Sequence, residues 1–311
     1  KRRVRKVIMG GTELVQYLAD QMSFGVNPIY VVGNYNKEEL EASIAEASWQ
    51  NQMILEEDYP KYTYWTWDAD KIEWGKKIYK IEVNYEISDS SERKRLQLEM
   101  LDKAEEIIDN VGLYTNGHYL EELYGINDYI IDHGSYSHYI TPNINHVMER
   151  KAYGILMEGK GVCTSYARAF QLVARKAGFI CVVDGGKALV KDKDTGEIKP
   201  GEHAWNMVCT EWQGDEYKKW LMVDPTWNDD ENEAEQPRNT YLMIPKSASK
   251  RNRESDELSF STRGKFAYIR QDWSNFEYDY FRYSDHSAGN SAEFINKICE
   301  YIRRGYVPLY F

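Results

Sequence analysis

The sequence predicts an α+β fold in which a helix beginning at Cys163 packs on a group of short strands. The first observation is a helical stripe of apolar residues after this cysteine, formed by Ala167, Phe170, Val173 and Ala174. The second is a series of apolar runs of strand length after that helix, at 179–183, 204–210 and 220–223. Together they predict a mixed core of one long helix and several strands.

The chain before about residue 90 has the pattern of a small α/β module. Residues 12–32 predict a helix that ends at a glycine, followed by a strand that a proline precedes. A second helix is predicted over 37–49, and alternating apolar residues predict a strand over 77–87. The aromatic cluster at 59–67 favours a strand pair packed on a helix, with an aromatic platform for peptide or glycan as the alternative.

A polar break at 88–92 separates this module from a helical region. Its Ser and Asp residues suit a helix N-cap, and helices are predicted over about 91–110 and 118–133. We therefore expect three parts: a small α/β module at 1–90, a central domain at 91–285 and a helix–strand unit at 286–311.

The last of these parts echoes residues 12–32. At a constant offset (293 − 13 = 280), four residues of the first unit reappear in the last: Glu13, Gly25, Pro28 and Tyr30 as Glu293, Gly305, Pro308 and Tyr310. The same helix–Gly–strand form is therefore expected twice, and chance similarity between two amphipathic helices is the alternative.

Charge and hydropathy exclude two classes of partner. Lys plus Arg is 39 and Asp plus Glu is 50, so the net charge is −11, which argues against nucleic acid because such partners require a basic surface. No apolar stretch approaches the ~18 residues of a membrane-spanning helix. The acidic charge, the modular ends and a chain that starts at Lys1 lead us to expect an extracellular or cell-surface protein of a bacterium.

The four cysteines form no CxxC pair and no metal-binding spacing, so no cofactor and no metal is expected. Cys181 and Cys209 both lie in apolar runs and are expected to be buried free thiols, with a disulfide between them as the alternative.

Cys163 lies where chemistry with a thiol is favoured. It follows Gly159 and Gly161, which are expected to give a flexible approach, and it starts the predicted helix. A helix N-terminus carries a partial positive charge and free N–H groups, which lower a thiol pKa and can hold an oxyanion. The alternative is a small buried residue at a tight helix start.

Two further residues complete a candidate catalytic set. His203 opens one apolar strand, and Asp224 ends the next strand just before Pro225. A base can activate the thiol, and a carboxylate can fix the imidazole, so a ring nitrogen is expected within about 4 Å of sulfur and the carboxylate at roughly 2.6–3.2 Å from the other nitrogen. Taken singly, His203 also fits a structural role and Asp224 a turn residue. The remaining histidines are expected to be non-catalytic: His118, His133, His138, His146 and His286.

These segments resemble the transglutaminase-like superfamily, in particular its bacterial members. The matching stretches are 152–163, 166–167, 178–179, 203–206 and 223–227, within a region of about 95–245. The resemblance implies a papain-like Cys-His-Asp triad, with the nucleophile at a helix start and the other two residues on adjacent antiparallel strands. It assigns Cys163 as nucleophile, His203 as general base and acid, and Asp224 as the orienting carboxylate.

The resemblance also implies an upstream side chain that helps to stabilise the oxyanion, for which Tyr136, Tyr139 and Tyr153 are the candidates. Animal members need calcium, but the acidic run 229–233 does not have the form of an EF-hand loop.

The resulting hypothesis is a cysteine enzyme that breaks a peptide or amide bond through a thioester. Water as the acceptor makes it a protease or amidase, which we rank first, and an amine makes it a cross-linking transferase. A non-catalytic surface or binding protein on the same scaffold is the alternative of another class. The expected partner is a protein or peptide substrate, with cell-wall peptide among the candidates.

Overall fold

The structure is a computed structural model. It describes residues 13–51, 64–68, 77–114, 119–138, 148–191, 195–213, 216–229, 239–245, 253–255 and 290–304. No helix within these ranges is both long and apolar enough to span a membrane.

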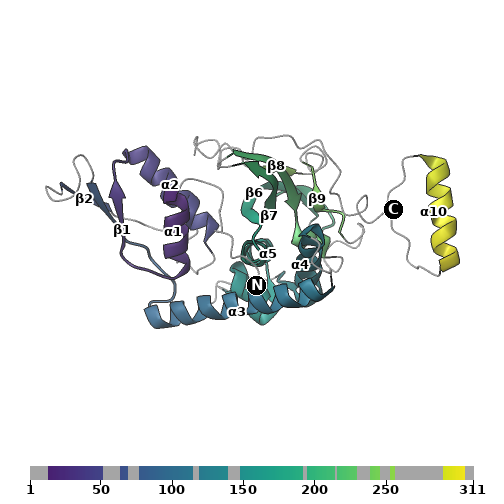
Figure 1. Cartoon of the computed structure of the whole chain (residues 1–311), viewed down its shortest axis with the longest axis horizontal. Helices are drawn as coiled ribbons and strands as arrows, with labels where there is room; N and C mark the ends of the chain where they lie inside the picture. The colour runs from purple at the N-terminus through teal and green to yellow at the C-terminus, as the bar shows by residue number, and fades with distance from the viewer. Residues whose placement is uncertain are drawn as a thin grey trace.

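The first part of the chain folds as a small sheet with two helices (Figure 1). Its elements are α1 (Glu13–Ser23), β1 (Ile29–Gly33), α2 (Lys37–Gln50), β2 (Tyr64–Asp68) and β3 (Lys77–Ile81). The strands form an antiparallel sheet of order β1-β3-β2. Asn36 caps α2 by accepting a hydrogen bond from the Glu39 amide at 2.8 Å, as expected of an N-cap side chain. The sequence therefore identified both helices, but the predicted strand over 77–87 is too long.

That strand ends at Ile81 because its partner ends there: Ile29, the first residue of β1, pairs with Ile81. Beyond this point Val83 bonds a side chain instead, since its amide donates to Asn27 Oδ1 at 3.1 Å. The alternation of apolar residues continues beyond the last paired residue, so it predicted a longer strand than the structure has.

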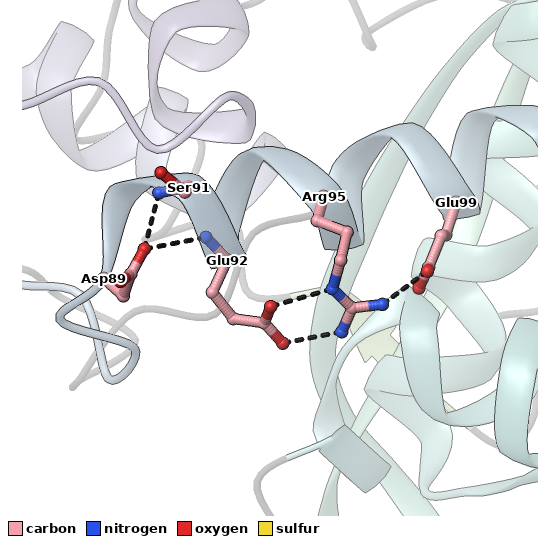
Figure 2. Close-up of polar contacts among 5 residues, drawn as sticks. All are labelled: Asp89, Ser91, Glu92, Arg95 and Glu99. Carbon is pink, nitrogen blue, oxygen red and sulfur yellow. Dashed lines mark hydrogen bonds and ion pairs between the residues drawn. The ribbon is translucent and has the colours of Figure 1, made fainter.

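The long helix α3 (Ser90–Tyr114) begins at the polar break that the sequence indicated. Asp89 accepts hydrogen bonds from the amides of Ser91 and Glu92 at 2.7 and 2.9 Å, which lowers the pKa of its carboxyl group (Figure 2). The Arg95 guanidinium donates two hydrogen bonds to the Glu92 carboxylate and one to the Glu99 carboxylate, along the exposed face of the helix (Figure 2). These surface pairs favour the helix only slightly because water screens them.

The central domain places one helix against an antiparallel sheet, as predicted. Its helices α4 (Tyr119–His133) and α5 (Cys163–Lys176) lie with α3 on one side of the sheet (Figure 1). The five strands have the order β10-β6-β7-β8-β9 and all pair antiparallel. Their bounds are Arg253–Ser255, Ile180–Lys191, Ile198–Gln213, Glu216–Val223 and Leu242–Ile244.

The strands β6, β7 and β8 are longer than the apolar runs that predicted them. Polar residues such as Lys187 and Glu202 extend β6 and β7, where they face each other in the ladder. The pairing of the strands therefore continues beyond the buried residues. The apolar runs in the sequence indicated only the part of each strand that lies in the core.

The two largest hydrophobic clusters of the described residues lie in the two parts of the chain. One is built from α1, α2 and the first sheet, between Leu14 and Val83. The other joins α3, α4, α5 and the large sheet, between Met100 and Met243. On this basis we propose that the division near residue 90 separates two modules. Arg93, at the start of α3, connects them, since its guanidinium donates to the carbonyl of Gly25 at 3.0 Å.

The C-terminal helix α10 (Ser291–Arg304) repeats the form of α1 but not its burial. Leu14 and Val15 are 7% and 0% exposed, whereas Phe294 and Ile295 at the same positions of the echo are 42% and 58% exposed. Both segments of the predicted repeat thus contain a helix, and the strand expected at 305–311 lies outside the described residues, so the repeat stays a prediction.

None of the four cysteines, which all lie in the described ranges, forms a disulfide. Cys181 pairs with Val208 across the β6–β7 ladder, and Cys209 pairs with Ile180, so the two thiols are one register position apart. Successive side chains of a strand point to opposite faces, which keeps these two sulfur atoms in different clusters and rules out the disulfide alternative. Burial raises the pKa of the Cys181 thiol to about 12.

Candidate active site

Cys163 is the first residue of α5, and its thiol is partly exposed. The approach to it is packed rather than flexible, which corrects the expectation for the two glycines. Gly159 has φ +66°, a conformation that favours glycine, and ends a π-helical turn (Gly154–Glu158). At Gly161 a Cβ would lie 2.4 Å from the side chain of Ser165, so only glycine allows this close approach. Cys163 therefore follows a closely packed stretch of backbone.

A short parallel strand pair brings Tyr136 beside Cys163. β4 (Ser135–Tyr136) pairs with β5 (Lys160–Gly161), so that Tyr136 lies opposite Gly161. The ladder continues where the Ser137 amide donates to the carbonyl of Gly161 at 2.9 Å. The Tyr136 phenol comes within hydrogen-bonding reach of the backbone amide and the thiol of Cys163. Burial, followed by the neighbouring Cys163, raises the pKa of Tyr136, so the phenol keeps its proton at neutral pH.

Tyr153 is the other described tyrosine candidate. Tyr153 has Glu99 and Arg95 of α3 among its electrostatic neighbours, and Tyr139 lies outside the described residues. Of the two described candidates, Tyr136 is thus the one that the structure places at Cys163.

His203 and Asp224 come together from neighbouring strands. Asn206 of β7 pairs with Val223, the last residue of β8, so Asp224 follows β8 beside the part of β7 that carries His203. The prediction that His203 opens its strand is wrong, because pairing with β6 extends β7 back to Ile198. His203 Nε2 lies 2.7 Å from Asp224 Oδ2, inside the expected range. Both side chains are buried, at 7% and 0% exposure. Since Nε2 is engaged, the remaining ring nitrogen, Nδ1, is the one available to Cys163, whose thiol is a hydrogen-bonding neighbour of the ring.

Asp224 is also the N-cap of the short helix α6 (Pro225–Asn228). Its second oxygen, Oδ1, accepts a hydrogen bond from the Trp227 amide at 3.1 Å. Pro225 occupies the first helical position, where a backbone N–H would have no partner within the helix, and proline has no N–H. The strand therefore leads directly into this helix. The carboxylate is therefore fixed from two directions, and it can hold the imidazole in a single orientation.

The electrostatic balance at His203 favours a protonated ring. Burial alone lowers the pKa of His203, but the charge and the hydrogen bond of Asp224, together with Cys163, outweigh it and raise the pKa to about 9. An imidazolium can therefore exist at neutral pH between a carboxylate and a thiol. Such an imidazolium can provide a proton for a leaving group.

Trp227 contacts His203 in a way that the sequence did not reveal. Its indole stacks on the imidazole with ring centroids 4.9 Å apart and planes at 22°. Tyr241 also contacts the indole, edge-on, with ring centroids 5.1 Å apart. Trp227 lies in the matching stretch 223–227. It is far from His203 in the sequence, so no local pattern indicated that the two rings stack.

Of the other histidines, two are described. His133 ends α4 and stacks on Tyr129, and the exposed His138 lies 5.1 Å from the ring of Tyr136. His118, His146 and His286 lie outside the described residues. Within the described part of the chain, no three His, Cys, Asp or Glu side chains are grouped closely enough to hold a metal ion.

Comparison with known families assigns this domain to a class. Residues 109–225 match the model of the transglutaminase-like superfamily, and the matched range contains Cys163, His203 and Asp224. The chain thus carries a transglutaminase-like domain, the class that the resemblance of its motifs indicated, and this class is associated with cysteine-based catalysis. No curated protein matches the chain.

Three solved structures are similar at low levels. A crystal structure of a TGase has 14% identity and a TM-score of 0.33, covering 64% of this chain and 51% of that protein. The periplasmic domain of TgpA from Pseudomonas aeruginosa has 19% identity and a TM-score of 0.31, with 54% and 59% covered. A candidate cysteine protease from Cytophaga hutchinsonii has 12% identity and a TM-score of 0.30, with 65% and 72% covered. The chain spans about half the length of the first of these proteins.

Proposed function

We propose that this chain breaks a peptide or amide bond by nucleophilic catalysis at Cys163, with His203 as general acid and base and Asp224 as its orienting carboxylate. The observation that carries the proposal is the 2.7 Å contact of His203 Nε2 with Asp224, which leaves the opposite ring nitrogen to the thiol at the start of α5. Each of the three groups then has the partner that its role requires.

In the first half of the reaction, the Cys163 thiolate attacks the carbonyl carbon of the amide and a carbon–sulfur bond forms. The carbonyl oxygen becomes an oxyanion, for which the Cys163 backbone N–H and the Tyr136 hydroxyl are the candidate donors. The His203 imidazolium then gives its proton to the amine nitrogen. The carbon–nitrogen bond breaks, the amine leaves, and a thioester remains on Cys163.

In the second half, neutral His203 takes a proton from the acceptor, which attacks the thioester carbonyl. The carbon–sulfur bond breaks, and the thiolate and the imidazolium form again. Water as the acceptor gives hydrolysis, which remains our first proposal, and a primary amine gives a new amide. The intact set of three residues disfavours the non-catalytic scaffold as an alternative. We keep a protein or peptide substrate and a location outside the cytoplasm as predictions from the sequence.

The test of the proposal is the relative reactivity of the four thiols. Cys299 on α10 is exposed, Cys163 is only partly exposed, and Cys181 and Cys209 are buried. Exposure alone predicts that iodoacetamide labels Cys299 first. Activation by the helix terminus and His203 predicts that Cys163 is labelled faster at pH 6–7. Peptide mass spectrometry over a time course measures the order, and labelling of Cys163 no faster than Cys299 would contradict an activated nucleophile.

Removing one hydroxyl tests the role of Tyr136. Tyr136→Phe is expected to lower kcat by about 100-fold, as the loss of one oxyanion donor does, with KM nearly unchanged. Alkylation of Cys163 by iodoacetamide passes through no oxyanion, so its rate should stay within about twofold of the wild type. Equal losses in both rates would instead assign Tyr136 to the activation of the thiol, and unchanged kcat would exclude it from the mechanism.

A further inference from the structure

The last turn of α2 reaches from the first module onto the catalytic sheet. Gln50, at its end, is fully buried, and its side-chain amide bonds both backbone groups of Val183 in β6, at 2.8 and 3.1 Å. The same amide oxygen accepts from Gln171 at 2.6 Å and from Arg175 at 3.2 Å, two residues of α5. Gln50 therefore takes the place of a neighbouring strand at this position of β6. The end of α2 is fixed in relation to the two elements, α5 and β6, that border the nucleophile.

This contact places Trp49 at the candidate site. Its indole N–H donates to the carbonyl of Val183 at 3.1 Å, and its ring lies over Gly185, where a Cβ would come within 3.1 Å of it. Gly185 is the ladder partner of Ala204, the residue after His203. The missing side chain at Gly185 thus lets an indole from a distant module lie against the strands that carry the catalytic base.

Trp49 and Cys163 share one small cluster. Both pack on the buried side chains of Ala167, Val183 and Ala204, and both are themselves only partly buried. Arg168 of α5 holds the indole from another direction, with its guanidinium carbon 5.5 Å from the ring centroid. The result is a fixed, partly exposed aromatic surface next to the nucleophile. It belongs neither to the matched family region, 109–225, nor to the three catalytic residues.

We propose that Trp49 forms one wall of the acyl-donor subsite and binds an apolar side chain of the substrate adjacent to the bond that is broken. An indole held by its N–H and by a cation on α5 is rigid and offers a flat apolar surface, which suits an aliphatic or aromatic side chain better than a charged one. This inference rests on the proposed function, because it takes Cys163 as the residue that is acylated.

The experiment compares three reagents that alkylate Cys163: iodoacetamide, N-phenethyl iodoacetamide and iodoacetate. Wild-type protein is expected to react with the phenethyl reagent about tenfold faster than with iodoacetamide, after correction for the rates with free cysteine, since binding one such group is worth about one factor of ten. Iodoacetate should show no such gain. Trp49→Ala should remove the preference and leave the iodoacetamide rate unchanged.

Two further variants control for folding. Trp49→Phe loses the N–H bond to Val183 but keeps an aromatic wall, so it should retain most of the preference. Tyr30 is an aromatic residue on β1 of the same module, and it is 48% exposed. Tyr30→Ala should therefore retain the full preference for the phenethyl reagent.

The outcomes separate the two proposals. A wild-type protein whose Cys163 reacts equally with the apolar and the small reagent overturns the subsite, even if Trp49→Ala does not fold. Equal losses with both reagents in Trp49→Ala overturn it too, because Trp49 would then act on the thiol. If Cys163 is labelled no faster than Cys299 by any reagent, the proposed function fails and the subsite falls with it.

Discussion

Cys163→Ala is expected to abolish turnover while leaving the folded protein intact. The substitution removes the atom that forms the thioester, so product formation should fall by at least about 1,000-fold, to the level that binding and oxyanion contacts alone sustain. The thiol is partly exposed and starts a helix that alanine favours, so the free energy of unfolding should change by less than about 1 kcal/mol. Thermal unfolding monitored by circular dichroism checks this second part.

The activity assay uses casein as a model protein, with and without dansylcadaverine as a primary amine. New amino termini or released ammonia report hydrolysis, and fluorescence attached to casein reports transfer. Cys299→Ala is the matched control, because it removes an exposed thiol on α10 and should keep full activity. Turnover that persists in Cys163→Ala would refute the nucleophile, whichever acceptor is used.

The second large effect is expected for Asp224→Asn. Asp224 accepts from two donors with two different oxygen atoms, His203 Nε2–H and the Trp227 amide. An asparagine has one oxygen and one NH₂ group, so one of these donors would face another donor in a site with no access to water. Either the imidazole takes the wrong tautomer or the cap of α6 is lost. We expect kcat/KM to fall by about 100- to 10,000-fold.

The same variant should change the pH dependence in a defined direction. The pKa of His203 is raised to about 9 in the folded protein, against 6.5 for the free side chain, and Asp224 is the main group that raises it. Wild-type kcat/KM should therefore decline above about pH 9, where the proton for the leaving amine is lost. Without the carboxylate, burial dominates, and this decline should move below the ordinary pKa of histidine. A decline at the same pH in both proteins would show that His203 is not the acid.

Stability should follow the same titration. The folded protein binds the His203 proton more tightly than the unfolded chain does, so this contribution is fully present below pH 6.5 and is lost as the pH rises to about 9. The difference in unfolding free energy between wild type and Asp224→Asn should therefore narrow across that window. Urea titrations at pH 6, 7.5 and 9 measure it.

The sequence by itself determined the fold class and the elements with strong local signals. Helices α2, α3, α4 and α5 were located because each combines an apolar stripe with a recognisable start, such as Asp89 or the glycines before Cys163. Cys163 and Asp224 could be selected because each lies at an element boundary, where a local pattern is most informative. His203 was selected because the apolar run after it predicted the start of a strand, although β7 begins at Ile198 and His203 lies inside it. The lengths of the strands could not be predicted, since pairing continues beyond the buried residues.

Only the tertiary structure decided which side chains surround Cys163. Tyr136 was one of three equal candidates until the parallel pairing of β4 with β5 placed it opposite Gly161. Trp227 stacks on His203 because two strands and a helix cap meet at that point. Trp49 gave no sign at all in the sequence, since it ends a helix of another module and reaches the site through hydrogen bonds to Val183. The physical reason is common to all three: patterns along a chain report contacts within a few residues, whereas an active-site wall is made by segments that only long-range packing brings together.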